Sequence, residues 1–93
     1  MKRLLLAALI LPTAVNAESY ELMLAREQWP KMQKLKSNAR KFIEMGDMTS
    51  ACSKMIKYDT YLEMNFEGLQ ELYPDADMFA LKKGTNDWIK KYC

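Results

Sequence analysis

The chain has 93 residues, of which 49% are hydrophobic and 28% are charged, and its formal net charge is +2. This length is enough for one small domain, and the charge is too small to indicate a nucleic-acid partner. The chain contains no histidine, which excludes histidine-based acid–base catalysis, Ser-His and Cys-His nucleophile pairs, and histidine-containing zinc sites.

The beginning of the chain has the order of a cleavable signal peptide. Two basic residues precede an unbroken apolar run from Leu4 to Leu11, and small residues then lead to Ala17. The apolar run is far shorter than the roughly 20 residues that a membrane-spanning helix needs. We therefore predict a signal peptide at residues 1–17, a small helical domain at residues 18–93, and export to the periplasm or the extracellular space.

Removal of the leader changes the charge balance. The leader holds two of the 14 basic residues and none of the 12 acidic ones, so the mature domain has 12 of each and is formally neutral. A neutral domain gives no electrostatic reason to expect nucleic acid or an anionic membrane as its partner.

Apolar residues at helical spacing run through the rest of the chain. Ser19 is suited to cap a first helix over 20–28, and Pro30 either kinks this helix or opens the next one. An apolar stripe over 32–43 follows, and Gly46 supplies a helix stop.

A second long helix is expected after this stop. Asp47 or Thr49 can cap it, and Pro74 ends it, because the residue before a proline avoids helical geometry. The sequence thus predicts an all-α fold built on a long antiparallel helical hairpin, with 20–45 packed against 48–73.

One or two short helices are expected after the hairpin. Asp75 can cap a helix over 76–83, which Gly84 ends, and Thr85 or Asn86 then opens a last helix.

The charges of the two arms are segregated. Residues 26–41 hold six bases and one acid, whereas residues 44–77 hold eight acids and two bases. A chain that folds back at Gly46 brings opposite charges together, which favours this register. The lysines Lys31, Lys34 and Lys36 are expected near the acids Asp59, Glu63 and Glu67.

Cys52 and Cys93 are the two cysteines of the chain. Disulfides persist in exported proteins, and we predict one intrachain bridge between this pair. The bridge would close a loop of about 42 residues, worth roughly 4 kcal/mol. An intermolecular bond through Cys93 and a reactive thiol are the alternatives, but the spacing is unlike the Cys-x-x-Cys of redox pairs.

Carboxylates and methionines are the remaining candidate ligands for a metal. Acidic residues recur every four positions up to Glu71, but apolar residues follow Asp77 where a calcium loop needs further oxygen ligands. Met45 and Met48 have a spacing found in copper-handling proteins, yet they straddle a helix stop. We expect no metal, no cofactor and no catalytic residue, and therefore no enzyme activity.

Four aromatic residues are the candidate partner-binding set. Tyr58 and Tyr61 lie on a face of the second helix other than its apolar stripe, and Trp29 and Trp88 add further aromatic surface. Either the C-terminal helices cover these rings, or the rings form an exposed patch that binds a protein.

The organisation of the chain, a leader followed by a small helical domain with two cysteines, resembles that of the acid-protective periplasmic chaperones. This resemblance of plan implies a chaperone-like binding role, although no motif around Cys52 or Cys93 is shared. We expect a monomeric, exported, non-catalytic binding, chaperone-like or structural protein with an unidentified protein partner. The alternative is a membrane-active or antagonistic peptide with a surface helix over 29–41, against which the neutrality of the mature domain argues.

Overall fold

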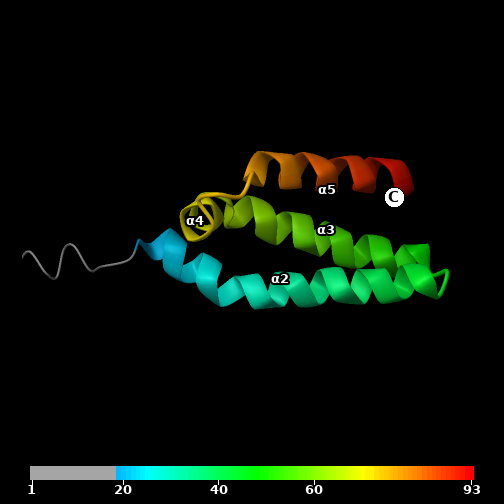
Figure 1. Ribbon diagram of the computed structural model, residues 1–93. Coiled ribbons are helices and arrows are strands. Elements are labelled where there is room, and N and C mark those ends of the chain that lie inside the picture. The colour runs from blue at the N-terminus through cyan, green and yellow to red at the C-terminus, as the bar shows by residue number, and fades with distance from the viewer. Residues whose placement is uncertain (1–18) are drawn as a thin grey trace, which may run out of the picture.

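The computed structural model describes residues 19–93, and the signal peptide predicted at residues 1–17 lies outside this part of the chain. The described residues form helices and no strands, which confirms the predicted all-α fold. The helices are α2 (Tyr20–Glu44), α3 (Met48–Met64), α4 (Phe66–Leu72) and α5 (Met78–Tyr92). Helices α2 and α3 form the predicted antiparallel hairpin, α4 turns across the start of α2, and α5 lies along α3 (Figure 1).

Helix α2 starts at the predicted cap, since the Ser19 hydroxyl accepts a hydrogen bond from the main-chain N–H of Leu22 at 3.0 Å. Pro30 lies inside α2, and the helix changes direction near this position (Figure 1). Proline removes one main-chain hydrogen bond and crowds the preceding turn, so a kink is its expected effect.

The core of the hairpin follows a coiled-coil repeat. The buried residues of α2 recur every seven positions, and those of α3 recur at steps of three and four. They are Ala25, Met32 and Ala39 on α2, and Ala51, Met55, Tyr58 and Leu62 on α3.

The tip of the hairpin has the predicted stop and one of the two predicted caps. Gly46 has a φ of +80°, and the N–H of Asp47 donates to the Phe42 carbonyl oxygen at 2.8 Å, as in a glycine-terminated helix end. The Asp47 carboxylate then accepts from the main-chain N–H of Ser50 at 3.1 Å and so caps α3. Hydrogen bonds from the Ser50 hydroxyl and N–H lower the pKa of Asp47.

The second arm is not one helix to residue 73, as the periodicity predicts, because it breaks at Asn65. The Asn65 side chain is buried, and its Nδ2 donates to Gln28 Oε1 at 2.7 Å and to the Tyr61 carbonyl oxygen at 2.8 Å. A polar side chain that bonds to the preceding turn competes with continuation of the helix. The chain therefore turns at Asn65 and starts α4.

Helix α4 approaches α2 closely at Gly68. A Cβ at this position would overlap the Glu21 main-chain carbonyl group and would lie 2.9 Å from the Ala25 Cβ. Gly68 is thus the residue that lets the two helix backbones meet.

The C-terminal segment is a single helix, which agrees with the one or two expected, but the expected division of this segment at Gly84 is wrong. Asp77 caps it in place of Asp75, with its carboxylate 2.9 Å from the N–H of Ala80. Gly84 lies within α5 and does not end it, and Thr85 beside it is buried. Packing of α5 on α3 offsets the weak helix propensity of glycine, which costs about 1 kcal/mol relative to alanine.

The predicted disulfide between Cys52 and Cys93 is present, with a Cα–Cα distance of 5.8 Å. It ties the C-terminal end of α5 to the first turns of α3.

The expected charge pairing between the hairpin arms is wrong. Lys82 on α5, not a lysine of α2, contacts Asp59 at 2.7 Å and Glu63 at 3.5 Å. Within residues 19–93, no ion pair joins α2 lysines to α3 acids. The lysines concerned are Lys31, Lys34 and Lys36.

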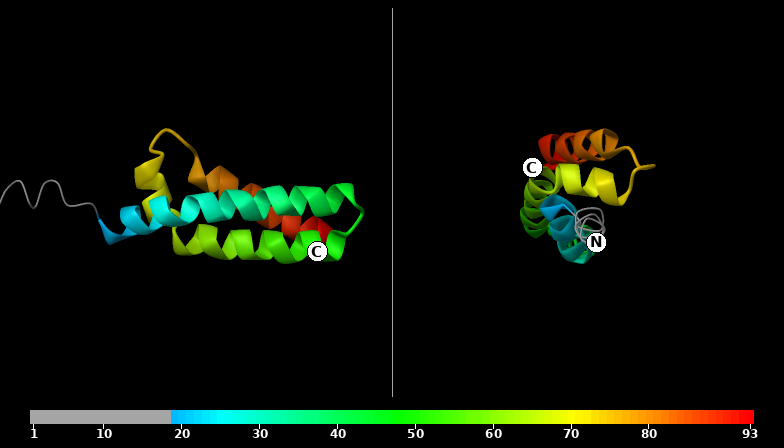
Figure 2. Two further views of the ribbon diagram at one scale, coloured as in Figure 1. Left: turned by 90° about the horizontal axis from the view of Figure 1, so that it is seen from below. Right: turned by 90° about the vertical axis from the view of Figure 1, so that its left-hand side faces the viewer.

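Helices α2 and α5 lie on different sides of α3, and no Cα atom of one lies within 8 Å of the other. Figure 1 and the right-hand view of Figure 2 show α3 between them. The described helices therefore form an open arrangement around α3, with grooves along its flanks.

Candidate functional site

The four aromatic residues predicted to bind a partner do not form one exposed patch. Tyr58 is only 1% exposed, and Lys36 Nζ lies 5.7 Å from the centroid of its ring. Burial raises the pKa of Tyr58. Tyr58 is thus a core residue, which corrects its assignment to a binding surface. Trp29 is half-buried and packs against Tyr73, with ring centroids 5.4 Å apart.

The other two residues of this set are partly exposed and line separate grooves. Tyr61 lies in a groove between α2 and α3 beside Lys31 and Lys57. Trp88 lies over Met55 in the gap between α2 and α5. Their surroundings differ, so the sequence-based set does not define a single site.

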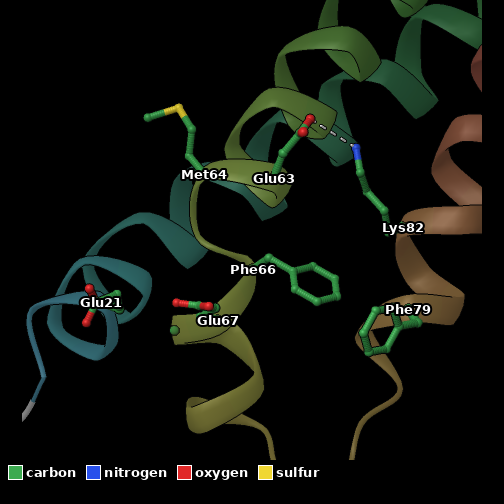
Figure 3. Close-up of a pocket in the computed structure, with 8 residues that line it drawn as sticks. Glu21, Glu63, Met64, Phe66, Glu67, Phe79 and Lys82 are labelled. Carbon is green, nitrogen blue, oxygen red and sulfur yellow. Dashed lines mark hydrogen bonds and ion pairs between the residues drawn. The ribbon is translucent and has the colours of Figure 1, made fainter.

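The largest of the grooves described here lies where α3 turns into α4, opposite the start of α5. We call it the elbow groove, and its volume is about 470 Å³. This volume is in the range of ligand-binding pockets. It is lined by Glu21, Glu63, Met64, Phe66, Glu67, Gly68, Phe79 and Lys82 (Figure 3).

An aromatic pair forms one wall of the elbow groove. Phe66 at the start of α4 and Phe79 at the start of α5 lie edge to face, with centroids 4.9 Å apart and an interplanar angle of 67°. Phe66 also packs against the core, whereas Phe79 is 68% exposed. Met64 extends on the other side of the groove and is 63% exposed (Figure 3).

The rim of the elbow groove is acidic. Three carboxylates line it, from Glu21 on α2, Glu63 on α3 and Glu67 on α4, against the single ammonium group of Lys82. Burial lowers the pKa of Lys82, but the hydrogen bond and charge of Asp59 and the charge of Glu63 outweigh this effect and raise it. Lys82 therefore stays protonated at neutral pH and neutralises only part of the rim.

The arrangement is suited to binding, because its polar groups are exposed carboxylates beside an apolar surface. Across residues 19–93, no group of three or more histidine, cysteine or acidic side chains is placed to hold a metal ion. In the same part of the chain, no helix combines the length and apolar character that crossing a membrane requires. Met32, central to the surface helix considered as an alternative, is fully buried in the core.

The sequence-based interpretation missed the elbow groove. Met64 and Phe79 are apolar residues that fall off the buried stripes, which is the signal that could have marked them. Phe66 was assigned to the stripe of a continuous helix, and the break at Asn65 is what aims its ring at Phe79.

Comparisons with protein-family models, with curated protein sequences and with solved structures find no match for this chain. The fold and the groove by themselves define a class: a small helical hairpin closed by one disulfide, with an open apolar groove and an acidic rim.

Proposed function

We propose that this protein is an exported, non-catalytic binding protein that uses the elbow groove to hold a basic, apolar segment of another protein. The observation that carries the proposal is the exposure of Met64 and Phe79 on a groove that three carboxylates also line. Exposed apolar side chains with a polar rim are typical of protein-interaction sites.

The residue types favour a segment with apolar side chains rather than a rigid polar ligand. Methionine adapts its shape to different partners, and the edge-to-face pair of Phe66 and Phe79 offers a broad aromatic surface. Such a groove tolerates varied sequences, which suits a chaperone-like role.

The acidic rim favours a partner with positive charge. Three acids against one base favour lysine or arginine next to the apolar side chains of the bound segment. Because these charges are exposed, we expect binding to weaken as the salt concentration rises.

The binding test uses two labelled amphipathic peptides of equal length, one built from leucine and lysine and the other from leucine and glutamate. Fluorescence anisotropy should show tighter binding of the cationic peptide. Phe79→Ser should weaken this binding by about tenfold, and Glu67→Lys should reduce the preference for the cationic peptide.

The matched control is Met45→Ser, because Met45 is 71% exposed but lies at the hairpin tip, far from the elbow groove. This variant should bind the cationic peptide as the unchanged protein does. Equal affinity for the two peptides, or an equal loss on Met45→Ser, would contradict the assignment of the elbow groove.

Export is tested separately by the intact mass of protein recovered outside the cytoplasm. Cleavage after Ala17 should give a chain that starts at Glu18 and that gains no mass on treatment with a thiol reagent. A recovered chain that still starts at Met1 would contradict export through a cleaved leader.

A further inference from the structure

A second groove has the opposite charge. We call it the lysine groove, and it lies along the seam between α2 and α3 with a volume of about 250 Å³. Its lining residues are Lys31, Lys34, Leu35, Asn38, Lys57 and Tyr61. All three charged residues in this set are basic.

No acidic residue lines the lysine groove. Lys57 on α3 lines the same groove as two lysines of α2, whereas the acids Asp59 and Glu63 are engaged by Lys82 on α5. No ion pair involves a lysine of this groove within residues 19–93.

Like charges on facing helices repel each other and lower the stability of the fold. Residues 18–93 hold as many acids as bases, so an acid between these lysines could have relieved the repulsion, yet no acid lines this groove. Packing of the hairpin therefore gives no reason for the cluster, and a bound anion does.

The side chains in the lysine groove suit an oxyanion attached to an organic group. Lysine ammonium groups bind phosphate and sulfate as point charges, and the half-buried Asn38 amide and the Tyr61 hydroxyl add hydrogen-bond donors. Leu35 and the Tyr61 ring supply an apolar surface beside them.

The size of the groove limits the ligand. A volume of about 250 Å³ equals that of about eight water molecules at ~30 Å³ each, which accommodates a phosphate and part of an attached group. We infer that the lysine groove binds a phosphate or sulfate group of an anionic ligand. This site is separate from the elbow groove, so neither assignment depends on the other.

The test measures binding of pyrophosphate by calorimetry at constant ionic strength, with sodium chloride as the competing salt. Lys57→Gln and Lys34→Gln should each weaken binding by about tenfold, because each removes a charge-assisted contact. Lys41→Gln is the control, since Lys41 is exposed on α2 but lines none of the grooves described above. It should change the affinity less than twofold, roughly the effect of a distant screened charge.

A second arm distinguishes a soluble ligand from a lipid headgroup. Vesicles containing phosphatidylglycerol are compared with vesicles of phosphatidylcholine alone, using the same variants. Binding to the anionic vesicles alone, with the same dependence on Lys57 and Lys34, supports the site and assigns its phosphate to a lipid.

Two results would overturn the inference. One is the absence of binding to both pyrophosphate and anionic vesicles. The other is an equal loss of affinity in Lys57→Gln and Lys41→Gln, which would show that binding reflects non-specific electrostatic attraction. The Lys57→Gln variant should remain folded, because it relieves repulsion, and its circular dichroism spectrum checks this.

Discussion

Two buried polar side chains, Tyr58 and Asn65, each have an oxygen with no hydrogen-bond partner among the described residues, namely Tyr58 Oη and Asn65 Oδ1. Buried groups of this kind cost free energy unless something else compensates. For Asn65 the compensation is visible, because its Nδ2 makes two hydrogen bonds and sets the turn into α4. For Tyr58 it is the burial of a large ring in the centre of the hairpin.

Tyr58→Phe is expected to stabilise the protein at neutral pH by about 1 kcal/mol, because it removes a buried hydroxyl without a partner and keeps the ring. Urea unfolding of both proteins measures this change. A less stable variant would contradict the prediction and would indicate that the hydroxyl has a bound partner such as water.

The same variant should alter the dependence of stability on pH. Burial raises the pKa of Tyr58 in the folded protein above its ordinary value of about 10. As the pH rises through about 10, the unfolded tyrosine ionises while the folded one stays protonated, so stability falls. Tyr58→Phe should remove this part of the loss, and alkaline unfolding curves of the two proteins would show it.

The helix ends that local chemistry determines were predicted correctly. Those that tertiary contacts determine were not. Ser19 and Gly46 act through hydrogen bonds and backbone geometry within a few residues, and both were predicted. The break at Asn65 depends on a contact with Gln28, and the continuation through Gly84 depends on packing against α3. Neither partner is close in sequence.

Gly68 and Gly84 test this contrast, because both lie inside helices and only one meets a neighbouring backbone. Gly68→Ala should destabilise the protein by roughly 1–3 kcal/mol, since its Cβ would force α4 away from Glu21. Gly84→Ala should stabilise it by roughly 0.5–1 kcal/mol, because its Cβ has open space and alanine favours a helix. Thermal unfolding that shifts in the same direction for both variants would contradict the close approach at Gly68.

At the scale of the whole molecule, α3 holds the structure together, since α2 and α5 pack on it from different sides and their own Cα atoms stay more than 8 Å apart. The charges also separate along the hairpin. Residues 31–41 hold five bases and no acid, and residues 59–77 hold six acids and no base. The two candidate grooves have these opposite signs, so the described helices present one acidic and one basic groove.

The open arrangement makes α5 depend on the disulfide. Replacing both Cys52 and Cys93 by alanine should cost about 4 kcal/mol, because the unfolded chain regains the freedom of a 42-residue loop. Hydrogen exchange should accelerate most in α5, whose backbone packs mainly against α3.

The control for this variant is Ser53→Ala, an exposed change next to Cys52 that keeps the bridge. It should leave the exchange of α5 unchanged. Equal acceleration in all four helices of the double variant would show that α5 does not detach separately.

The sequence by itself determined the helical class, the hairpin with its tip at Gly46, and the pairing of Cys52 with Cys93. These features follow from apolar periodicity, from backbone chemistry at a helix end, and from the presence of just two cysteines. The tertiary structure decided where the second arm breaks, which lysine neutralises the acids of α3, and which apolar residues stay exposed. Each of these depends on contacts between residues far apart in the sequence, such as Asn65 with Gln28 and Lys82 with Asp59, and the spacing of residues along the chain does not reveal such contacts.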